Sequence, residues 1–214
     1  MKEVQKPPEI DLCGWGTPYD FFAKAKTWEK ICDEEILALC RNESGHKESS
    51  EKDVVTFLYD LARSSNAKSI IEVGVYHGAS SMALAKALAD NDGGEIHLVD
   101  ISPDYLNDVR NKIQSKNFPV TVNVHHVEND ESFQSFNLPQ AHLVFVDANH
   151  NYEHVQKDIA LYWPLVSQGG CMILHDTVKH YGTRKSAMDF FAKGHPVCTF
   201  ATSHGSGMTV LKKA

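Results

Sequence analysis

Two aspartates and two histidines stand out among the residues whose types and spacing could do chemistry. Asp147 precedes His150 by three positions, and His175 lies directly before Asp176. Carboxylates are the ligands that hard divalent cations such as Mg²⁺ prefer. An unperturbed imidazole titrates near pH ~6.5, so it can accept a proton at neutral pH. Asp147 and Asp176 could therefore share a metal, with Asp147 and His150 acting together on a hydroxyl that loses its proton.

A glycine-containing segment forms a second candidate site. Residues 72–78 read EVGVYHG, and they join a short apolar run to a stretch rich in Ala and Leu. Gly74 and Gly78 permit a sharp turn, and the start of the following helix favours an anion. Tyr76 stands where a GxGxxG fingerprint needs glycine, and the Gly-Lys-Ser/Thr of a P-loop is absent from the segment. The turn is therefore better suited to a carboxylate than to a pyrophosphate.

Asp100 ends the next apolar run after this turn. At that position a carboxylate can accept hydrogen bonds from both hydroxyls of a ribose. A ligand that combines a carboxylate, an amine and a ribose therefore fits the two segments. The expected cofactor-binding residues are Glu72, Gly74, Tyr76, His77, Gly78, Ser80, Asp100, Asn129 and Asp147.

The pattern along the chain predicts the elements that position these residues. Short apolar runs at 69–73, 95–99, 119–127, 142–146 and 171–174 alternate with helical segments. Such runs predict parallel strands that are covered on both faces, and 197–201 with 208–211 predict a terminal hairpin. The fold class is thus α/β, a Rossmann-like three-layer sandwich whose seven-stranded sheet is mostly parallel and ends in an antiparallel hairpin. Ligands of such sheets bind beyond the carboxyl ends of the strands, where the candidate residues lie.

The same residues carry a family resemblance. The E-x-G-x-x-x-G turn at 72–78, followed by Asp100, resembles class I S-adenosylmethionine (SAM)-dependent methyltransferases. Residues 142–176, HLVFVDANHNYEHVQKDIALYWPLVSQGGCMILHD, resemble the small-molecule O-methyltransferases that include macrocin O-methyltransferase and other enzymes of antibiotic and sugar tailoring. With the closing segment 207–213, the resemblance covers 50–214. It implies SAM as cofactor, a sugar, phenol or natural-product hydroxyl as acceptor, metal ligands at the matching aspartates and a base at His150.

One departure from these relatives concerns the metal. They usually carry two adjacent acidic residues, or Asp-Asn, where this chain has His175-Asp176-Thr177. Mg²⁺ is the first expectation, but a nitrogen from His175 would favour Mn²⁺, Fe²⁺ or Zn²⁺. Thr177 could instead ligate weakly, or the enzyme could work without a metal. A protein of the same fold that binds the cofactor without transferring a methyl group, or that catalyses another reaction, is the alternative function.

Composition sets the broader limits. The chain has 214 residues, with 21 Lys+Arg, 28 Asp+Glu and a formal net charge of −7. This acidic balance argues against a nucleic-acid surface, and we find neither an apolar run of membrane-spanning length nor an export signal. Five cysteines without a CxxC pair are typical of reduced thiols in the cytoplasm.

The polar stretch 41–50 divides the chain into two expected parts. Residues 1–50 form an N-terminal helical extension, with a helix around 28–39 and an aromatic-rich start that suits a lid over the cofactor mouth or a part of the acceptor pocket. The same aromatic residues could instead make a homodimer contact. Residues 51–214 form the methyltransferase domain, and Ser50, directly before it, is expected to cap its first helix.

Overall fold

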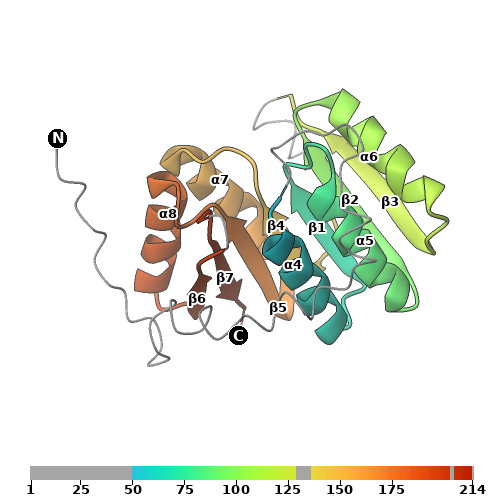
Figure 1. Cartoon of the computed structure of the whole chain (residues 1–214). Coiled ribbons are helices and arrows are strands. Elements are labelled where there is room, and N and C mark those ends of the chain that lie inside the picture. Colours follow the sequence, from blue (N-terminus) through green and yellow to red (C-terminus); the bar gives the residue numbers. More distant parts are fainter. Residues whose placement is uncertain (1–49, 129–135, 203–204, 214) are drawn as a thin grey trace.

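The computed structural model describes residues 50–128, 136–202 and 205–213. Seven strands form one sheet in the order β3-β2-β1-β4-β5-β7-β6 (Figure 1). Strands β1 to β5 pair in parallel, whereas β7 runs antiparallel to both of its neighbours. This confirms the expected α/β class and the C-terminal hairpin.

The helices and strands have the following bounds along the chain: α4 (Lys52–Ser64), β1 (Ser69–Val73), α5 (Ala79–Asp90), β2 (Gly94–Asp100), α6 (Pro103–Ser115), β3 (Val120–His126), β4 (Ala141–Val146), α7 (Tyr152–Tyr162), η3 (Trp163–Leu165), β5 (Val166–His175), α8 (Tyr181–Ala192), β6 (Val197–Phe200) and β7 (Met208–Lys212).

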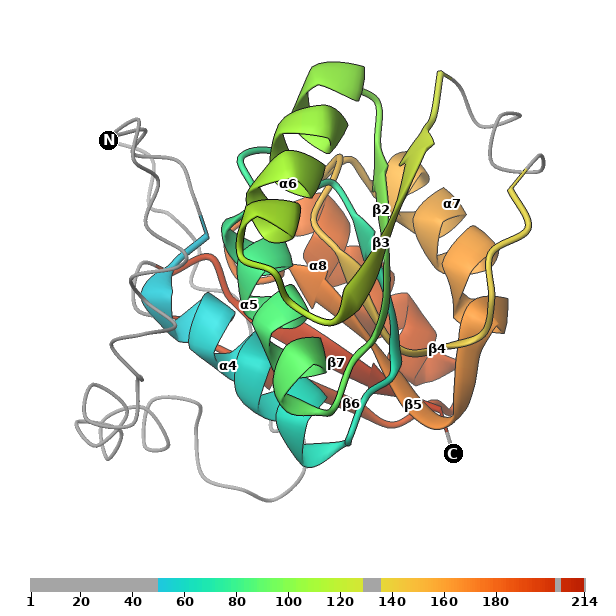
Figure 2. The same cartoon turned by 90° about the vertical axis from the view of Figure 1, so that its right-hand side faces the viewer.

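Two apolar layers lie on the two faces of the sheet. On one face, α4, α5 and α6 pack against side chains such as Ile70 and Leu98. On the other face, α7 and α8 cover a second set that includes Ile71 and Val144 (Figure 2). Neighbouring residues of one strand thus point into different cores, because side chains of a strand alternate between its faces. Every residue of β1 is buried, which explains why its sequence is mainly apolar, with Glu72 as the buried exception.

The predicted boundaries agree best where apolar runs are bounded by turn residues. β1 and α5 begin and end as expected, but β5 starts five residues earlier than the predicted 171. Gly169 and Gly170 resemble a loop in sequence, yet the strand runs through them. Gly170 has no room for a side chain there, since a Cβ would lie 2.7 Å from the carbonyl oxygen of His142 on β4. Likewise, α8 begins at Tyr181 rather than near 184.

The expectation that Ser50 caps α4 is wrong. Glu51 occupies the N-cap position, and its side chain makes no capping hydrogen bond to the helix. Its carboxylate accepts a hydrogen bond from Ser206 Oγ instead, at 2.6 Å. The expected N-terminal helix at 28–39 and the candidate Asn129 lie outside the described residues.

Adjacent strands carry the candidate residues to one edge of the sheet. β2, β1, β4 and β5 are consecutive neighbours, so their carboxyl ends lie side by side. Backbone hydrogen bonds connect the loops just beyond them: Gly74 N donates to Val99 O, and Asp147 N donates to Val73 O, both at 2.8 Å. None of the described helices has the length and apolar character needed to cross a membrane.

Candidate functional site

The turn after β1 requires glycine at two positions. Gly74 has φ +84°, and a Cβ on it would lie 2.2 Å from the carbonyl oxygen of Asp147. Gly78, also at φ +84°, would place a Cβ 2.7 Å from the side chain of Val109 on α6. Tyr76 adopts a positive φ of 42° between them. The turn therefore lies tightly between the loop after β4 and α6, with the N-terminus of α5 behind it.

Asp100 fixes the shape of this turn. Its Oδ2 accepts hydrogen bonds from the backbone N–H of Val75, at 2.8 Å, and of Tyr76, at 3.4 Å. Its Oδ1 accepts from the N–H of Ser102, the N-cap of α6. A carboxylate offers about four acceptor sites, so these contacts leave capacity for a ribose hydroxyl.

Glu72 lies fully buried beneath the turn. Its Oε1 accepts a hydrogen bond of 2.5 Å from Ser80 Oγ on α5, whereas Oε2 has no hydrogen-bond partner. Burial raises the pKa of Glu72 to about 8, against the lowering effect of Ser80 and Ser81 and with a further rise from Asp147 and Asp100. Glu72 is therefore largely protonated at neutral pH, because few groups there stabilise its charged form.

An aromatic group borders the same turn. The rings of Tyr76, His77 and Tyr105 contact one another, with centroid separations of 3.9 to 5.4 Å. Tyr105 belongs to α6, so this group connects the turn to the helix after β2. The predicted cofactor residues from 72 to 100 are thus neighbours in the structure.

The ends of β4 and β5 bring a second set of polar side chains together. Asp147 Oδ1 lies 3.1 Å from His175 Nδ1, and Asp176 Oδ2 lies 3.7 Å from the same nitrogen. Neither ring nitrogen of the buried His175 meets the geometry of a hydrogen bond, and Asp176 Oδ1 is also unpaired. Asp176, the first residue after β5, has a positive φ of 58°. The groups are close without pointing at one another.

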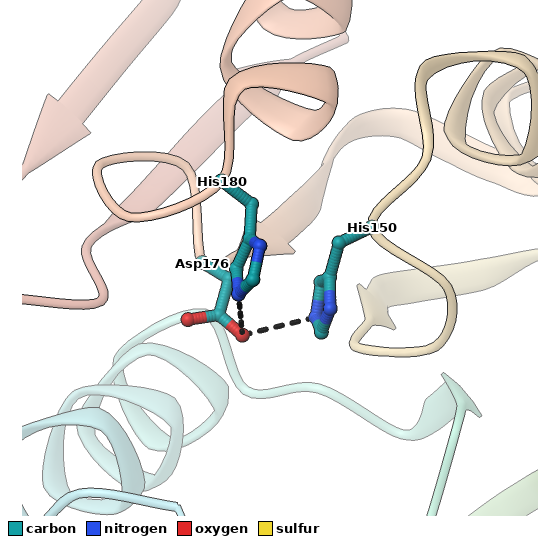
Figure 3. A group of neighbouring side chains, drawn as sticks. All are labelled: His150, Asp176 and His180. Atoms are coloured by element: carbon teal, nitrogen blue, oxygen red, sulfur yellow. Dashed lines mark ion pairs between the residues drawn. The ribbon is translucent and has the colours of Figure 1, made fainter.

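His150 approaches this set from the loop after β4. Its Nε2 lies 2.9 Å from Asp176 Oδ2 and 3.7 Å from Asp147 Oδ1. Its ring stacks on that of His180 with centroids 4.3 Å apart and an angle of 10° between the planes (Figure 3). Gly182 of α8 packs closely against this loop, since a Cβ there would lie 2.3 Å from the carbonyl oxygen of His150.

Opposite charges shift the protonation of these residues. Interactions with Asp147 and Asp176 raise the pKa of His150 to about 9. Burial alone would lower the pKa of His175, but Asp147 and Glu51 raise it to about 10. Burial would raise the pKa of Asp147 and of Asp176, yet the nearby histidines hold the pKa of both carboxyls below the usual range. Without other ligands, the set therefore consists of ionised carboxylates and protonated histidines.

Two overlapping trios among the described residues have ligand atoms close enough for one metal ion. Asp147, His175 and Asp176 form one, and His150, Asp176 and His180 form the other; within each, the atoms lie within 4.8 Å of one another. An imidazole binds a metal through a lone pair in its ring plane, and two parallel stacked rings cannot both aim at one ion. The trio of Asp147, His175 and Asp176, with its unpaired nitrogen and oxygen atoms, therefore fits a cation better.

Three further residues lie near the acidic set: Thr177, which the sequence offered as a ligand, and Glu51 and His180, which it did not. Thr177 Oγ1 accepts a hydrogen bond from Thr209 of β7, which directs it toward the sheet rather than the acidic set. Sequence reasoning missed Glu51, whose Oε2 lies 3.8 Å from His175 Nε2, and did not single out His180, whose Nε2 lies 4.0 Å from Asp176 Oδ2. Glu51 has no distinctive spacing from the other candidates, and His180, four residues after Asp176, is one of twelve histidines, so the tertiary structure is needed to identify both.

Comparison with known proteins gives the class of this fold. An O-methyltransferase from Bacillus cereus, solved in complex with SAH, is 18% identical with a TM-score of 0.65, and covers 84% of this chain and 90% of its own. TomG from Streptomyces achromogenes, an O-methyltransferase involved in tomaymycin synthesis and solved with SAM, is 18% identical with a TM-score of 0.65, covering 85% and 91%. A putative caffeoyl-CoA O-methyltransferase from Staphylococcus aureus is 17% identical with a TM-score of 0.62, covering 77% and 85%. The fold is thus that of the O-methyltransferases.

The family follows from the sequence itself. Residues 71–177, half of the chain, match a family described as a methyltransferase domain. The chain belongs to this methyltransferase family, which confirms the resemblance found in the turn at 72–78 and the segment 142–176. No curated protein matches the sequence.

Proposed function

We propose that this protein transfers a methyl group from SAM to a hydroxyl of a small molecule, a sugar, a phenol or a natural product. The observation that carries the proposal is the adjacency of two half-sites at one sheet edge. The glycine turn with Asp100 suits SAM, and the set of Asp147, His150, His175 and Asp176 beside it suits a hydroxyl. The fold and the family support the same reaction.

In the cofactor half, each group has a role that follows from its position. Asp100 would accept a hydrogen bond from a ribose hydroxyl, while amide groups of the turn and of the start of α5 would face the amino-acid carboxylate. Tyr76 and His77 would cover the same end. Glu72 and Ser80 would support the turn from beneath.

In the acceptor half, the chain would orient the hydroxyl and remove its proton. The reaction forms an O–CH₃ bond as the bond from that methyl to the sulfonium sulfur breaks, leaving S-adenosylhomocysteine. The proton of the hydroxyl passes to His150 Nε2 and then to solvent. His150 can accept it only when Asp147 and Asp176 are engaged elsewhere, because these carboxylates otherwise keep its pKa at about 9.

We assign Asp147, Asp176 and His175 as ligands of a divalent cation. A bound cation would polarise the acceptor hydroxyl and lower its pKa. Mg²⁺ suits the two carboxylates, and the nitrogen of His175 makes Mn²⁺ an equally suitable probe. The unpaired buried atoms of His175 and Asp176 support this assignment.

The experiment has two parts, cofactor binding and turnover. We expect SAM to bind in isothermal titration, and methyl transfer to catechol or to a panel of phenols and sugars to require Mg²⁺ or Mn²⁺ and to stop with chelator. H150Q should lower kcat by about 10²–10⁴-fold and leave the Kd of SAM unchanged. H154Q is the matched control, because His154 is exposed on α7. SAM binding without turnover on any acceptor would favour a cofactor-binding protein instead.

We propose that the enzyme is cytoplasmic, in keeping with its five cysteines and the absence of a CxxC pair. We further propose that residues 1–50 act as a lid or complete the acceptor pocket. Their aromatic composition, and the place where they join the domain beside Glu51 and Ser206, support this. Deleting residues 1–40 should raise the KM of the acceptor far more than the Kd of SAM. An equal effect on both constants would count against the lid.

A further inference from the structure

The carboxylate of Glu51 reaches the acceptor half from outside the strand ends. Glu51 precedes α4, yet its side chain turns inward and is only 9% exposed. One oxygen accepts the hydrogen bond from Ser206 Oγ, and the other lies 3.8 Å from His175 Nε2 without a hydrogen-bond partner. The side chain makes no hydrogen bond to the N–H groups of the helix that it precedes. Here it faces a buried histidine instead.

His175 therefore has a different acid at each ring nitrogen. Nδ1 faces Asp147 at 3.1 Å, on the side of the trio that fits a cation, and Nε2 faces Glu51. A neutral imidazole carries one N–H, and only the other nitrogen has a lone pair for a metal. If Glu51 accepts a hydrogen bond from the N–H of Nε2, then Nδ1 carries the lone pair, on the side of Asp147 and Asp176.

The support of Glu51 is itself anchored to the site. Ser206 lies before β7, and its carbonyl oxygen accepts hydrogen bonds from Val178 N and Lys179 N in the loop after β5. Gly207 packs against the same loop, since a Cβ there would lie 2.2 Å from Val178 Cγ2. Glu51 is thus held by a segment that is itself hydrogen-bonded to the loop after Asp176, which fixes the carboxylate relative to His175.

We propose that Glu51 is a positioning residue that selects the Nε2–H tautomer of His175. This inference rests on the metal assignment of the proposed function. Glu51 would thereby present Nδ1 to a divalent cation shared with Asp147 and Asp176. A carboxylate that accepts the second N–H of a ligating histidine fixes its ring and typically contributes about 10–100-fold to metal affinity.

The test compares two substitutions that remove the same charge. E51Q keeps an oxygen that can accept from Nε2, and its amide N–H₂ can donate to Ser206 Oγ; E51M has similar length but no acceptor. We expect E51M to weaken Mn²⁺ binding about 10–100-fold in isothermal titration of the full chain, and E51Q to restore most of that affinity. E95M is the matched control, because Glu95 also lies beside a histidine, 3.3 Å from His97 Nε2, at the other end of β2.

Each outcome separates this inference from the function on which it rests. If the wild type binds Mn²⁺ and E51M binds it equally well, or if E51Q and E51M weaken it equally, the tautomer role is overturned while the metal site stands. If the wild type binds SAM but no Mn²⁺, the metal assignment fails and this inference fails with it. Should E51M not fold, S206A gives the same test, with a smaller loss of Mn²⁺ affinity expected. The Kd of S-adenosylhomocysteine should stay within about twofold in all variants.

Discussion

The two halves of the site lie at the same edge of the sheet but differ in how their polar groups are satisfied. In the cofactor half, Asp100 accepts three backbone hydrogen bonds and Gly74 is fixed by close backbone contact. In the acceptor half, His175, His150 and Asp176 present buried atoms that are near opposite charges but not aligned with them. Buried polar groups are normally paired, so the second arrangement is the one that needs a ligand.

This difference teaches which half is preformed. The chain's own backbone shapes the cofactor half, so it should bind SAM without help from a metal. The acceptor half holds close carboxylates and histidines that a cation or an acceptor would bring into alignment. Glu72 is the exception in the first half, since its Oε2 is unpaired, and its raised pKa of about 8 explains how the fold tolerates it.

Replacing Gly74 with alanine should have the largest effect, because it breaks the preformed half. The side chain would meet the backbone of Asp147 at a positive φ, and we expect a loss of about 3–5 kcal/mol in the free energy of unfolding. G169A is the control: Gly169 has φ +74° but nothing within 4 Å of a Cβ, so only about 1–2 kcal/mol should be lost. Urea denaturation measures both, and equal losses would disprove the role of the close contact.

The pH dependence of stability should show the unusual state of Glu72. The native pKa of about 8 lies above the ordinary value of 4.5, so above pH 4.5 the native state keeps a proton that the unfolded chain loses. Stability therefore falls as pH rises from 4.5 to 8. E72Q removes this contribution, so its stability relative to wild type should improve by about 3 kcal/mol between pH 5 and pH 7 in urea denaturation. A difference that does not change with pH would contradict the buried, protonated state.

Much of the fold was predictable because buried strands and helix faces require apolar residues, and these are visible as patterns in the sequence. β1 and β4 are covered on both faces and read as mainly apolar runs, and their ends were placed correctly to within a residue. β5 was predicted too short, because Gly169 and Gly170 have the composition of a loop. Their place in a strand depends on the close approach of β4, which a local pattern does not contain.

The candidate site was predictable to the extent that topology alone determines it. Asp100, Asp147 and Asp176 follow parallel strands, and the carboxyl ends of such strands share an edge. Glu51 lies at the N-cap of α4, so its approach to the site depends on how this helix packs on the sheet. His180 follows Asp176 by four residues, but this spacing alone does not distinguish it from the other histidines of the chain, so sequence reasoning found neither residue.

A pair of asparagine substitutions should separate the two halves directly. D176N removes a carboxylate from the acceptor half, and we expect Mn²⁺ binding to weaken about 100-fold while the Kd of S-adenosylhomocysteine changes less than about threefold. D100N should do the reverse, weakening S-adenosylhomocysteine about 10–100-fold by loss of the charged acceptor for the ribose. Isothermal titration of both ligands checks this, and a variant that weakens both equally would show that the halves are not independent.

The smallest expected effect concerns the support of His150. Gly182 contacts the backbone of the His150 loop without a positive φ, so G182A should lower the free energy of unfolding by about 2 kcal/mol through overpacking alone. G194A is a useful comparison, because a Cβ on Gly194 has nothing within 4 Å and only its φ of +89° opposes the change. G182A should also lower kcat with catechol by about tenfold, since a loop displaced from α8 carries His150 away from Asp176, whereas G194A should leave kcat unchanged. A G182A enzyme with wild-type kcat would show that this contact stabilises the fold without positioning the base.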